Sequence, residues 1–142
     1  MFARPARIAS CLALLIGLPV VAMAAGEGGG IGARTVIQRQ LDAFQRGDAE
    51  GAFALASPAL KAAYSNSNNF LESVRSGNTP FFHRRITEYD DFLLNGDDAA
   101  QSVVVVDDNS NVWNVVYKLS RQPDGVWMID GVLLSKSDAT DL

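Results

Sequence analysis

The segment VWNVVYKLSRQPDGVWMIDGVLLS, residues 112–135, has the pattern of a β-hairpin. Both arms are rich in β-branched and aromatic residues, and Pro123-Asp124-Gly125 between them is a turn sequence. Alternate side chains of a strand face opposite sides, so each arm has one strongly apolar face. In the first arm this face carries Trp113, Val115, Tyr117 and Leu119. In the second arm the same alternation selects Trp127, Ile129, Gly131 and Leu133.

Two further strands are predicted before this hairpin, over residues 84–94 and 99–106. The turn sequences at 95–98 and 107–111 separate them from each other and from the strand over 112–121. Short connections of this kind join antiparallel neighbours. We therefore expect a four-stranded antiparallel sheet that ends with residues 126–135. Both of its faces keep apolar residues, so helices should cover one face and the other should be partly covered.

The first half of the chain has helical spacing instead. Over residues 33–46, Val36, Ile37, Leu41 and Phe44 form an apolar stripe that ends at Gly47. Two short helices are predicted next, the first after an Asp48 N-cap and the second after Ser57-Pro58. The run at 65–69 should break the latter helix, and one or two helical turns should follow before residues 76–78. Helices followed by an antiparallel meander define an α+β fold.

Residues 1–24 have the three parts of a secretory signal peptide. Arg4 and Arg7 precede an apolar run without acidic residues, and Ala22-Met23-Ala24 fits a signal peptidase site, which predicts cleavage after Ala24. The run is too short for a stable transmembrane helix, so no membrane insertion is expected after cleavage. Cys11 lies too early in the run for a lipidation site and should leave with the signal. We therefore expect a periplasmic or secreted protein.

The mature chain is predicted to contain one domain. Residues 25–32 are rich in glycine and should form a flexible leader, residues 33–137 the α+β domain, and residues 138–142 a C-terminal tail. The 142-residue sequence has ordinary globular composition, with 48% hydrophobic and 20% charged residues.

Charge and motif content exclude several functions. The net charge is −4, and loss of Arg4 and Arg7 makes it more negative, so nucleic-acid binding is not expected. With one cysteine, one histidine and no phosphate-binding or dinucleotide motif, the sequence predicts no metal site and no cofactor. The acidic run 107–111 lacks the glycine and the distal glutamate of a calcium loop, and a hairpin turn accounts for it.

Two parts of the chain resemble a known family. Residues 37–44 followed by Gly47-Asp48-Ala49 and 52–58 are similar to the opening of the bacterial family called domain of unknown function 4864, and residues 122–132 resemble its ending. The match would cover about residues 35–137. More widely, the pattern resembles the nuclear transport factor 2-like superfamily. That resemblance implies a curved sheet wrapped around a long helix, making a cone whose open end often holds a small ligand or substrate. It implies no particular activity.

A cavity enzyme of the isomerase or lyase type would need a general base inside the cone. Asp90 is the best carboxylate candidate, because strict alternation puts it on one face with Ile86, Phe92 and Leu94. His83, the only histidine, is the other candidate, although it precedes Arg84 and Arg85 and has no orienting carboxylate in sequence. Tyr117 or Tyr64 would then donate a hydrogen bond. The alternative is that Asp90 and His83 are solvated surface residues, which we favour because a buried carboxylate without a partner is unstable.

The leading hypothesis is a non-catalytic module that binds a small apolar or aromatic ligand or another protein. Its candidate ligand-binding residues are aromatic: Tyr117, Trp113, Tyr64 and Tyr89. Packing against the first helix explains Trp113 and Tyr117 without a ligand, and we favour that interpretation of these two residues. A homodimer formed through the sheet is a further possibility, since one apolar face is left to be covered.

Overall fold

The structure is a computed structural model that describes residues 24–77 and 79–138. In this part of the chain four helices precede one four-stranded antiparallel sheet, which confirms the predicted α+β class. The helices are α1 (Ala24–Arg46), α2 (Ala49–Ala54), α3 (Pro58–Ala62) and α4 (Ser67–Ser76). The strands are β1 (Arg84–Asn95), β2 (Asp98–Asp107), β3 (Val112–Arg121) and β4 (Trp127–Lys136), in the order β1-β2-β3-β4.

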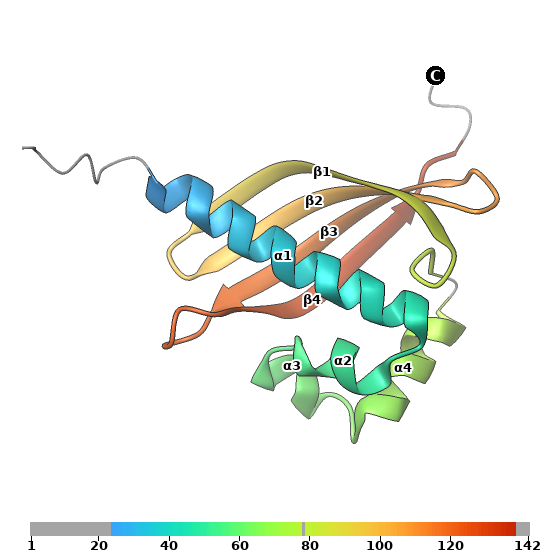
Figure 1. Ribbon diagram of the computed structural model, residues 1–142, viewed down its shortest axis with the longest axis horizontal. Coiled ribbons are helices and arrows are strands. Elements are labelled where there is room, and N and C mark those ends of the chain that lie inside the picture. The colour runs from blue at the N-terminus through green and yellow to red at the C-terminus, as the bar shows by residue number, and fades with distance from the viewer. Residues whose placement is uncertain (1–23, 78, 139–142) are drawn as a thin grey trace, which may run out of the picture.

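The elements form a cone around one core. The sheet curves, α1 runs across one of its faces, and α2, α3 and α4 gather beyond β4 near the C-terminal end of α1 (Figure 1). The buried stripe of α1, including Ile37, Leu41 and Phe44, packs on the inner face of the sheet. Within the described residues, no helix is long and apolar enough to cross a membrane.

Side-chain caps start the short helices. The Asp48 carboxylate accepts a hydrogen bond from the Gly51 amide at 2.9 Å, and Ser57 Oγ accepts one from the Leu60 amide at 3.2 Å, as the sequence predicts. The run at 65–69 does more than break a helix. Asn66 caps α4, which begins at Ser67, by accepting a hydrogen bond from the Asn69 amide at 2.9 Å.

The flexible leader expected over 25–32 is wrong, because α1 already begins at Ala24. Glycines disfavour an isolated helix, but here two aromatic rings pack against its backbone, and the missing side chain of Gly32 leaves room for one of them. Gly29 and Gly30 are buried, and a Cβ at either position would lie 3.6–3.8 Å from the ring of Phe92. A Cβ at Gly32 would come within 3.0 Å of Cδ1 of Trp127. The predicted signal peptide, apart from Ala24, and residues 139–142 of the predicted tail lie outside the described residues.

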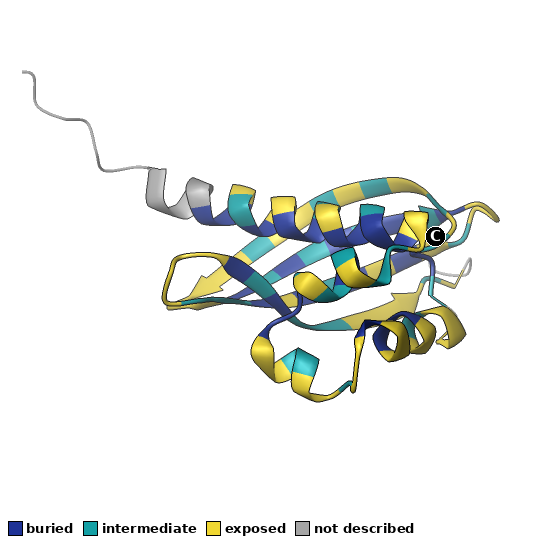
Figure 2. Cartoon of the chain, turned by 60° about the horizontal axis from the view of Figure 1, so that its bottom comes forward, coloured by how far each residue is buried: buried dark blue, intermediate teal, exposed yellow. Residues whose placement is uncertain are grey.

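Alternation in β3 is as predicted. Trp113, Val115, Tyr117 and Leu119 are all buried, while Val112, Asn114 and Lys118 on the other side are exposed. Figure 2 shows that buried residues alternate with less buried ones along β2 and β3. The inner face of β2 and β3 is therefore the floor of the core.

The alternation predicted for β1 is wrong beyond Tyr89, because the pairing with β2 shifts register between Tyr89 and Phe92. Tyr89 and Phe92 both pack against the core, whereas Asp90 and Asp91 are exposed. The buried amide of Gln101 holds this bulge by donating to the carbonyl oxygens of Asp90 and Asp91 at 2.9 and 3.2 Å. Asp90 thus shares the exposed face with Ile86, and the extra residue turns Phe92 inward without it.

A second bulge corrects the prediction for β4. Leu119 pairs with Ile129, but Lys118 pairs with Gly131, so the strand gains a residue between these pairs. After the bulge Val132 packs on the core, and Leu133, expected to face inward, is 57% exposed. The inner side chains of β4 are therefore Trp127, Ile129, Val132 and Leu134.

Candidate functional site

A cavity of about 270 Å³ opens where the helices meet β4, and we call it the cone cavity. Helices α1, α3 and α4, the segment after α4 and the second half of β4 contribute to it. Its lining consists of Gln40, Phe44, Leu60, Tyr64, Phe70, Ser73, Val74, Gly77, Thr79, Phe81, Ile129, Gly131, Val132 and Leu134.

Aromatic rings shape the cone cavity. Phe44 of α1 stacks on Phe81 with ring centres 5.6 Å apart, and it also meets Phe70 of α4 at 5.9 Å. Tyr64 completes this wall with an edge-to-face contact to Phe70 at 5.2 Å. Because the rings come from separate elements, the wall exists only when α1, α4 and the segment before β1 are packed together.

The polar atoms around the cone cavity are neutral. The Gln40 amide donates to the Ala52 carbonyl at 3.2 Å, which holds that side chain in place. Ser73 Oγ donates to Tyr64 Oη at 3.4 Å. Among the described residues, none that lines the cavity is Asp, Glu, His, Lys or Arg. The cavity therefore suits an uncharged apolar body that carries at most a hydrogen-bonding group.

Tyr117, the first of the predicted ligand-binding residues, is a core residue instead. Its side chain is fully buried, does not line the cone cavity, and its hydroxyl has no hydrogen-bond partner in the described structure. Burial raises the pKa of Tyr117 well above its usual range, and the neighbouring Tyr89 adds to this. The hydroxyl is therefore neutral and does not line the cone cavity.

Two other predicted ligand-binding residues also have structural partners. Trp113 Nε1 donates to the Asp107 carboxylate at 3.1 Å, beneath the turn that joins β2 to β3. Tyr89 Oη donates to Gln38 Oε1 on α1 at 2.9 Å, and burial raises the pKa of Tyr89 to about 12. Of the four predicted residues, only Tyr64 lines the cone cavity.

Neither candidate base lines the cone cavity. Asp90 is exposed at the β1 bulge. The His83 side chain is 80% exposed, and its Nδ1 lies 3.9 Å from the carboxylate of Asp108. His83 borders two surface depressions that share Thr79 with the cone cavity, but His83 itself does not line the cavity. The two residues are therefore not brought together as an acid–base pair.

Asp107 is the most strongly hydrogen-bonded carboxylate of the described chain. It accepts from the amides of Asn109 and Asn111 at 2.9 Å, from the Asn111 side chain, and from Trp113. Burial alone would raise the pKa of Asp107, but these hydrogen bonds outweigh it and lower the pKa to about 2. The Asp107 carboxylate therefore stabilises the turn between β2 and β3. Among the described residues no group of three or more His, Cys, Asp or Glu could hold a metal ion.

Sequence reasoning missed Gln40, Phe70 and Val132 as cavity residues. Gln40 gave the clearest signal, because a polar side chain interrupts the apolar stripe between Ile37 and Phe44 on α1. Val132 could not be found by alternation, since the β4 bulge changes which side chains face inward.

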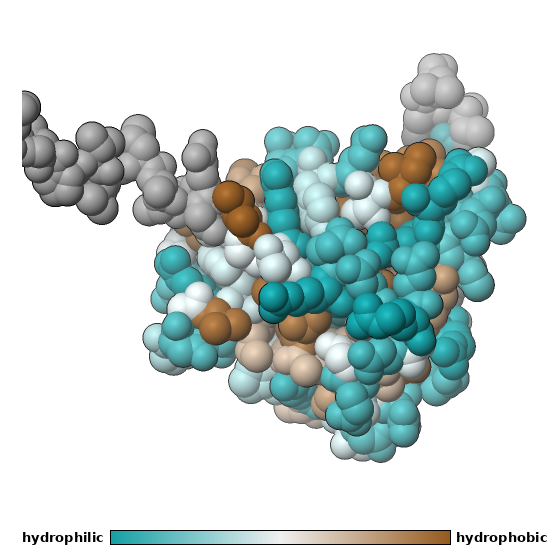
Figure 3. All heavy atoms as spheres, viewed as in Figure 1, coloured by the Kyte–Doolittle hydropathy of each residue, from teal (hydrophilic) through white to brown (hydrophobic). Residues whose placement is uncertain are grey.

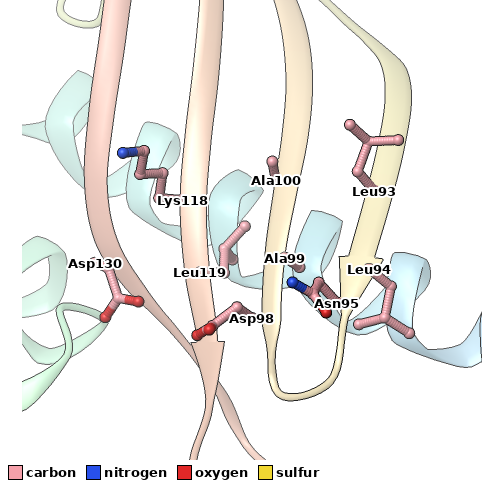
Figure 4. A pocket seen from close by; sticks show the side chains of 9 residues that line it. All are labelled: Leu93, Leu94, Asn95, Asp98, Ala99, Ala100, Lys118, Leu119 and Asp130. Atoms are coloured by element: carbon pink, nitrogen blue, oxygen red, sulfur yellow. The ribbon is translucent and has the colours of Figure 1, made fainter.

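A second, more open depression of about 390 Å³ lies on the opposite face of the sheet. We call it the outer depression. In Figure 4, Leu93 and Leu94 of β1, Lys118 of β3 and Asp130 of β4 surround it, with α1 behind the strands. Asp130 accepts a hydrogen bond from Ser120 Oγ at 2.9 Å. By contrast, the face that carries α1 is mostly hydrophilic, with small separate hydrophobic patches (Figure 3).

A long helix packed in a curved antiparallel sheet, with an apolar cavity at the open end, defines the nuclear transport factor 2-like class of cone folds. Solved structures agree with this class. A protein from Shewanella frigidimarina with a provisional ketosteroid isomerase assignment has a TM-score of 0.56 and 16% identity, over 76% of this chain and 98% of that chain. Two NTF2-like proteins of unknown function are similar too.

The NTF2-like protein from Shewanella baltica has a TM-score of 0.56 and 9% identity, over 80% of this chain and 97% of that chain. That from Silicibacter pomeroyi has a TM-score of 0.55 and 14% identity, over 78% and 98%.

The chain belongs to the family described as Domain of unknown function (DUF4864), whose family model matches residues 30–142. A comparison with curated proteins finds no match. At these identities the solved structures establish the fold alone.

Proposed function

We propose that this protein is a binding protein whose cone cavity takes a small apolar or aromatic ligand. The observation that carries the proposal is the lining of the cavity, which combines aromatic and aliphatic walls with a few neutral polar groups. Such a lining excludes water from an apolar ligand and orients it by one or two hydrogen bonds. Gln40, Tyr64 and Ser73 supply those groups.

A cavity enzyme of the isomerase or lyase type is less well supported. It requires an ionisable group that reaches the proton to be moved. The two candidates for that role, Asp90 and His83, do not line the cone cavity. Among the described residues that line it, Tyr64 has the only titratable side chain. Binding without acid–base chemistry is therefore the function that we propose.

Titration calorimetry with indole as the probe tests this proposal. Leu60 lines the cone cavity, so Leu60→Trp should fill it and abolish the heat of indole binding. Leu93→Trp, the same substitution in the outer depression, is the matched control and should leave binding unchanged. Absence of indole binding by the wild type, or equal loss in both variants, would refute a ligand site in the cone cavity.

We further propose that the protein is exported and works in the periplasm or the medium. The charged start, the apolar run and Ala22-Met23-Ala24 support this. N-terminal sequencing of protein from its own host should find Ala25 as the first residue. An intact Met1, or recovery from the membrane fraction, would contradict export and cleavage.

Self-association through the outer sheet face is a second proposed function. Leu93 is 69% exposed and Leu133 is 57% exposed on that face, close to the outer depression. Around a two-fold axis each copy would offer both protruding leucines and a hollow. Leu93→Asp should then convert dimer to monomer in sedimentation velocity, whereas Ile31→Asp on α1 should not. A monomeric wild type at all concentrations would rule it out.

A further inference from the structure

The second half of β4 has an unpaired edge. β4 is the last strand of the sheet, so only β3 pairs with it in register. The amide of Ser137 donates to the Val112 carbonyl at 2.8 Å, which fixes the alternation of hydrogen bonds between the two strands. Residues 133, 135 and 137 direct their backbone groups toward β3. Val132, Leu134 and Lys136 therefore direct theirs away from the sheet.

Within the described residues, no group bonds to the outward amides and carbonyls of Val132, Leu134 and Lys136. Residues 133–136 are all exposed and Val132 is half-buried, so most of this edge is open to solvent. In Figure 2 this stretch of β4 is coloured as exposed. These three residues offer three donors and three acceptors to an added strand.

The first half of the same edge already binds an extended segment. The Ile129 amide donates to the Leu55 carbonyl at 2.9 Å, and the Ser57 amide donates to the Ile129 carbonyl at 2.8 Å. Ala56 thereby forms a parallel bridge to Ile129. The chain then turns away into α3 at Pro58, before it reaches Val132. The chain's own residues thus show that this edge accepts an extended partner.

The opposite edge of the sheet is protected, and β4 is not. β1 has two register shifts, one near Arg85 and one at Asp90 and Asp91, and its exposed side chains there are charged. Bulges and charges of this kind prevent strand addition. Beyond its bulge at Asp130, β4 is regular and contains Val132, Leu133 and Leu134. The two edges therefore differ in their capacity to take another strand.

The open edge adjoins the cone cavity. Gly131, Val132 and Leu134, which belong to this edge, also line the cavity. A strand added to β4 would place every second side chain on the inner face, next to Val132 and Leu134. One of those side chains would then reach the cone cavity.

We propose that the ligand is an extended peptide, which pairs by its backbone with residues 132–136 of β4 and places one apolar side chain in the cone cavity. This inference rests on the proposed ligand site and specifies its ligand class. Main-chain hydrogen bonds supply affinity and the cavity supplies specificity, as in other cases of strand addition. Leu60 of α3 and Phe70 of α4 line the same cavity as Val132 and Leu134, so helices lie close to this edge and favour a single added strand over the sheet of a second copy.

A displayed library of random seven-residue peptides tests the proposal on the mature protein. We expect enrichment of peptides with alternating apolar residues and an aromatic residue at one position, and loss of that enrichment in Leu60→Trp. For an enriched peptide, N-methylation of the residues that face β4 should weaken binding by about tenfold or more, because each methyl group removes a main-chain hydrogen bond. Methylation of the alternate residues is the matched control.

Hydrogen exchange gives a readout at single amides. Peptide binding should protect the amides of Val132, Leu134 and Lys136, while those of Leu133 and Ser135 are already protected by β3. Lys136→Pro removes one outward donor without removing a cavity atom, and should weaken binding relative to Lys136→Ala.

The other possible results would each contradict one part of the proposal: the peptide, the strand addition, the single occupant or the cavity site. Indole binding without peptide enrichment would leave the ligand site intact and refute the peptide. Equal affinity for both methylated peptides would show side-chain capture without strand addition. Protection of Val132 and Leu134 that grows with protein concentration in the absence of peptide would mean that a second copy occupies the edge. Failure of indole to bind would refute the cavity site itself, whether or not a peptide is enriched.

Discussion

The Tyr117 hydroxyl is buried without a partner, whereas the Tyr89 hydroxyl donates to Gln38. A hydroxyl that is buried without a hydrogen-bond partner loses its hydrogen bonds to water, and this desolvation destabilises the folded state by about 1–3 kcal/mol. Tyr117→Phe should therefore raise the free energy of unfolding by about 1 kcal/mol or more. Tyr89→Phe removes a hydrogen bond that is made and should lower it by about 1 kcal/mol. Urea denaturation measures both. A loss of stability in Tyr117→Phe would mean that its hydroxyl has a partner, such as a buried water.

Asp107 should make stability depend on pH. Its pKa in the folded protein is about 2, lowered from 3.8, so the folded state favours the carboxylate more than the unfolded state does. This contribution is fully present above about pH 4 and is lost as the pH falls from 3.8 toward 2. Asp107→Asn should reduce stability at pH 7 by about 1–3 kcal/mol, and the difference from wild type should shrink at pH 3.

Denaturation at the two pH values checks this, with Asp108→Asn as the control. The carboxylate of Asp108 is 63% exposed and should change stability little at pH 7. A difference between wild type and Asp107→Asn that stays constant from pH 7 to pH 3 would contradict the assignment.

At the scale of elements, the glycines of α1 are not equivalent. A Cβ at Gly30 would meet the Phe92 ring at 3.6 Å, an ordinary contact, whereas at Gly32 it would meet Trp127 at 3.0 Å. Gly30→Ala should therefore stabilise the protein, by up to about 1 kcal/mol, through helix propensity. Gly32→Ala gains the same propensity but displaces Trp127, so it should be less stable than Gly30→Ala. Thermal denaturation of the pair measures the difference. Equal stabilisation would mean that Trp127 shifts at no cost.

The elements also explain which sequence predictions are correct. Helix caps at Asp48 and Ser57 and the alternation of β3 depend on local chemistry, and the structure confirms them. The bulges in β1 and β4 depend on partners distant in sequence, such as Gln101 for the carbonyls of Asp90 and Asp91. Strict alternation cannot reveal an extra residue of this kind. It therefore assigned Asp90 and Leu133 to the wrong face.

The cone cavity was less predictable than the fold. Its lining comes from α1, α3, α4 and β4, and no short segment contains more than a fraction of it. Tyr64 was selected for its aromatic ring and hydroxyl, and it does line the cavity. Tyr117 and Trp113 have the same chemistry, but the first is in the core and the second bonds to Asp107. The residue types suggested ligand binding. Only the tertiary packing shows which of these aromatic residues line the cavity and which belong to the core.

At the scale of the whole molecule, Trp127 connects the two ends of the chain. Its ring meets Phe92 of β1 edge to face at 6.4 Å and lies against Gly29 and Gly32 of α1. It is only 6% exposed. Trp127→Ala should lower the free energy of unfolding by about 3–5 kcal/mol, because it leaves a large cavity between helix and sheet.

Guanidinium denaturation followed by circular dichroism measures this loss. Val126→Ala is the neighbouring control, since Val126 is exposed and should change stability little. A loss below about 1 kcal/mol for Trp127→Ala would mean that the glycine-rich part of α1 is not held by this ring.

The packing of Gly29, Gly30 and Gly32 on Phe92 and Trp127 sets an order of events during synthesis. These glycines leave the ribosome early, but a glycine-rich turn has little helical tendency of its own. One of the rings that hold it belongs to β4, which is the last strand to be made. The N-terminal part of α1 therefore lacks its full packing surface until nearly the whole chain has emerged. Full packing of this helix therefore follows synthesis of the C-terminal hairpin.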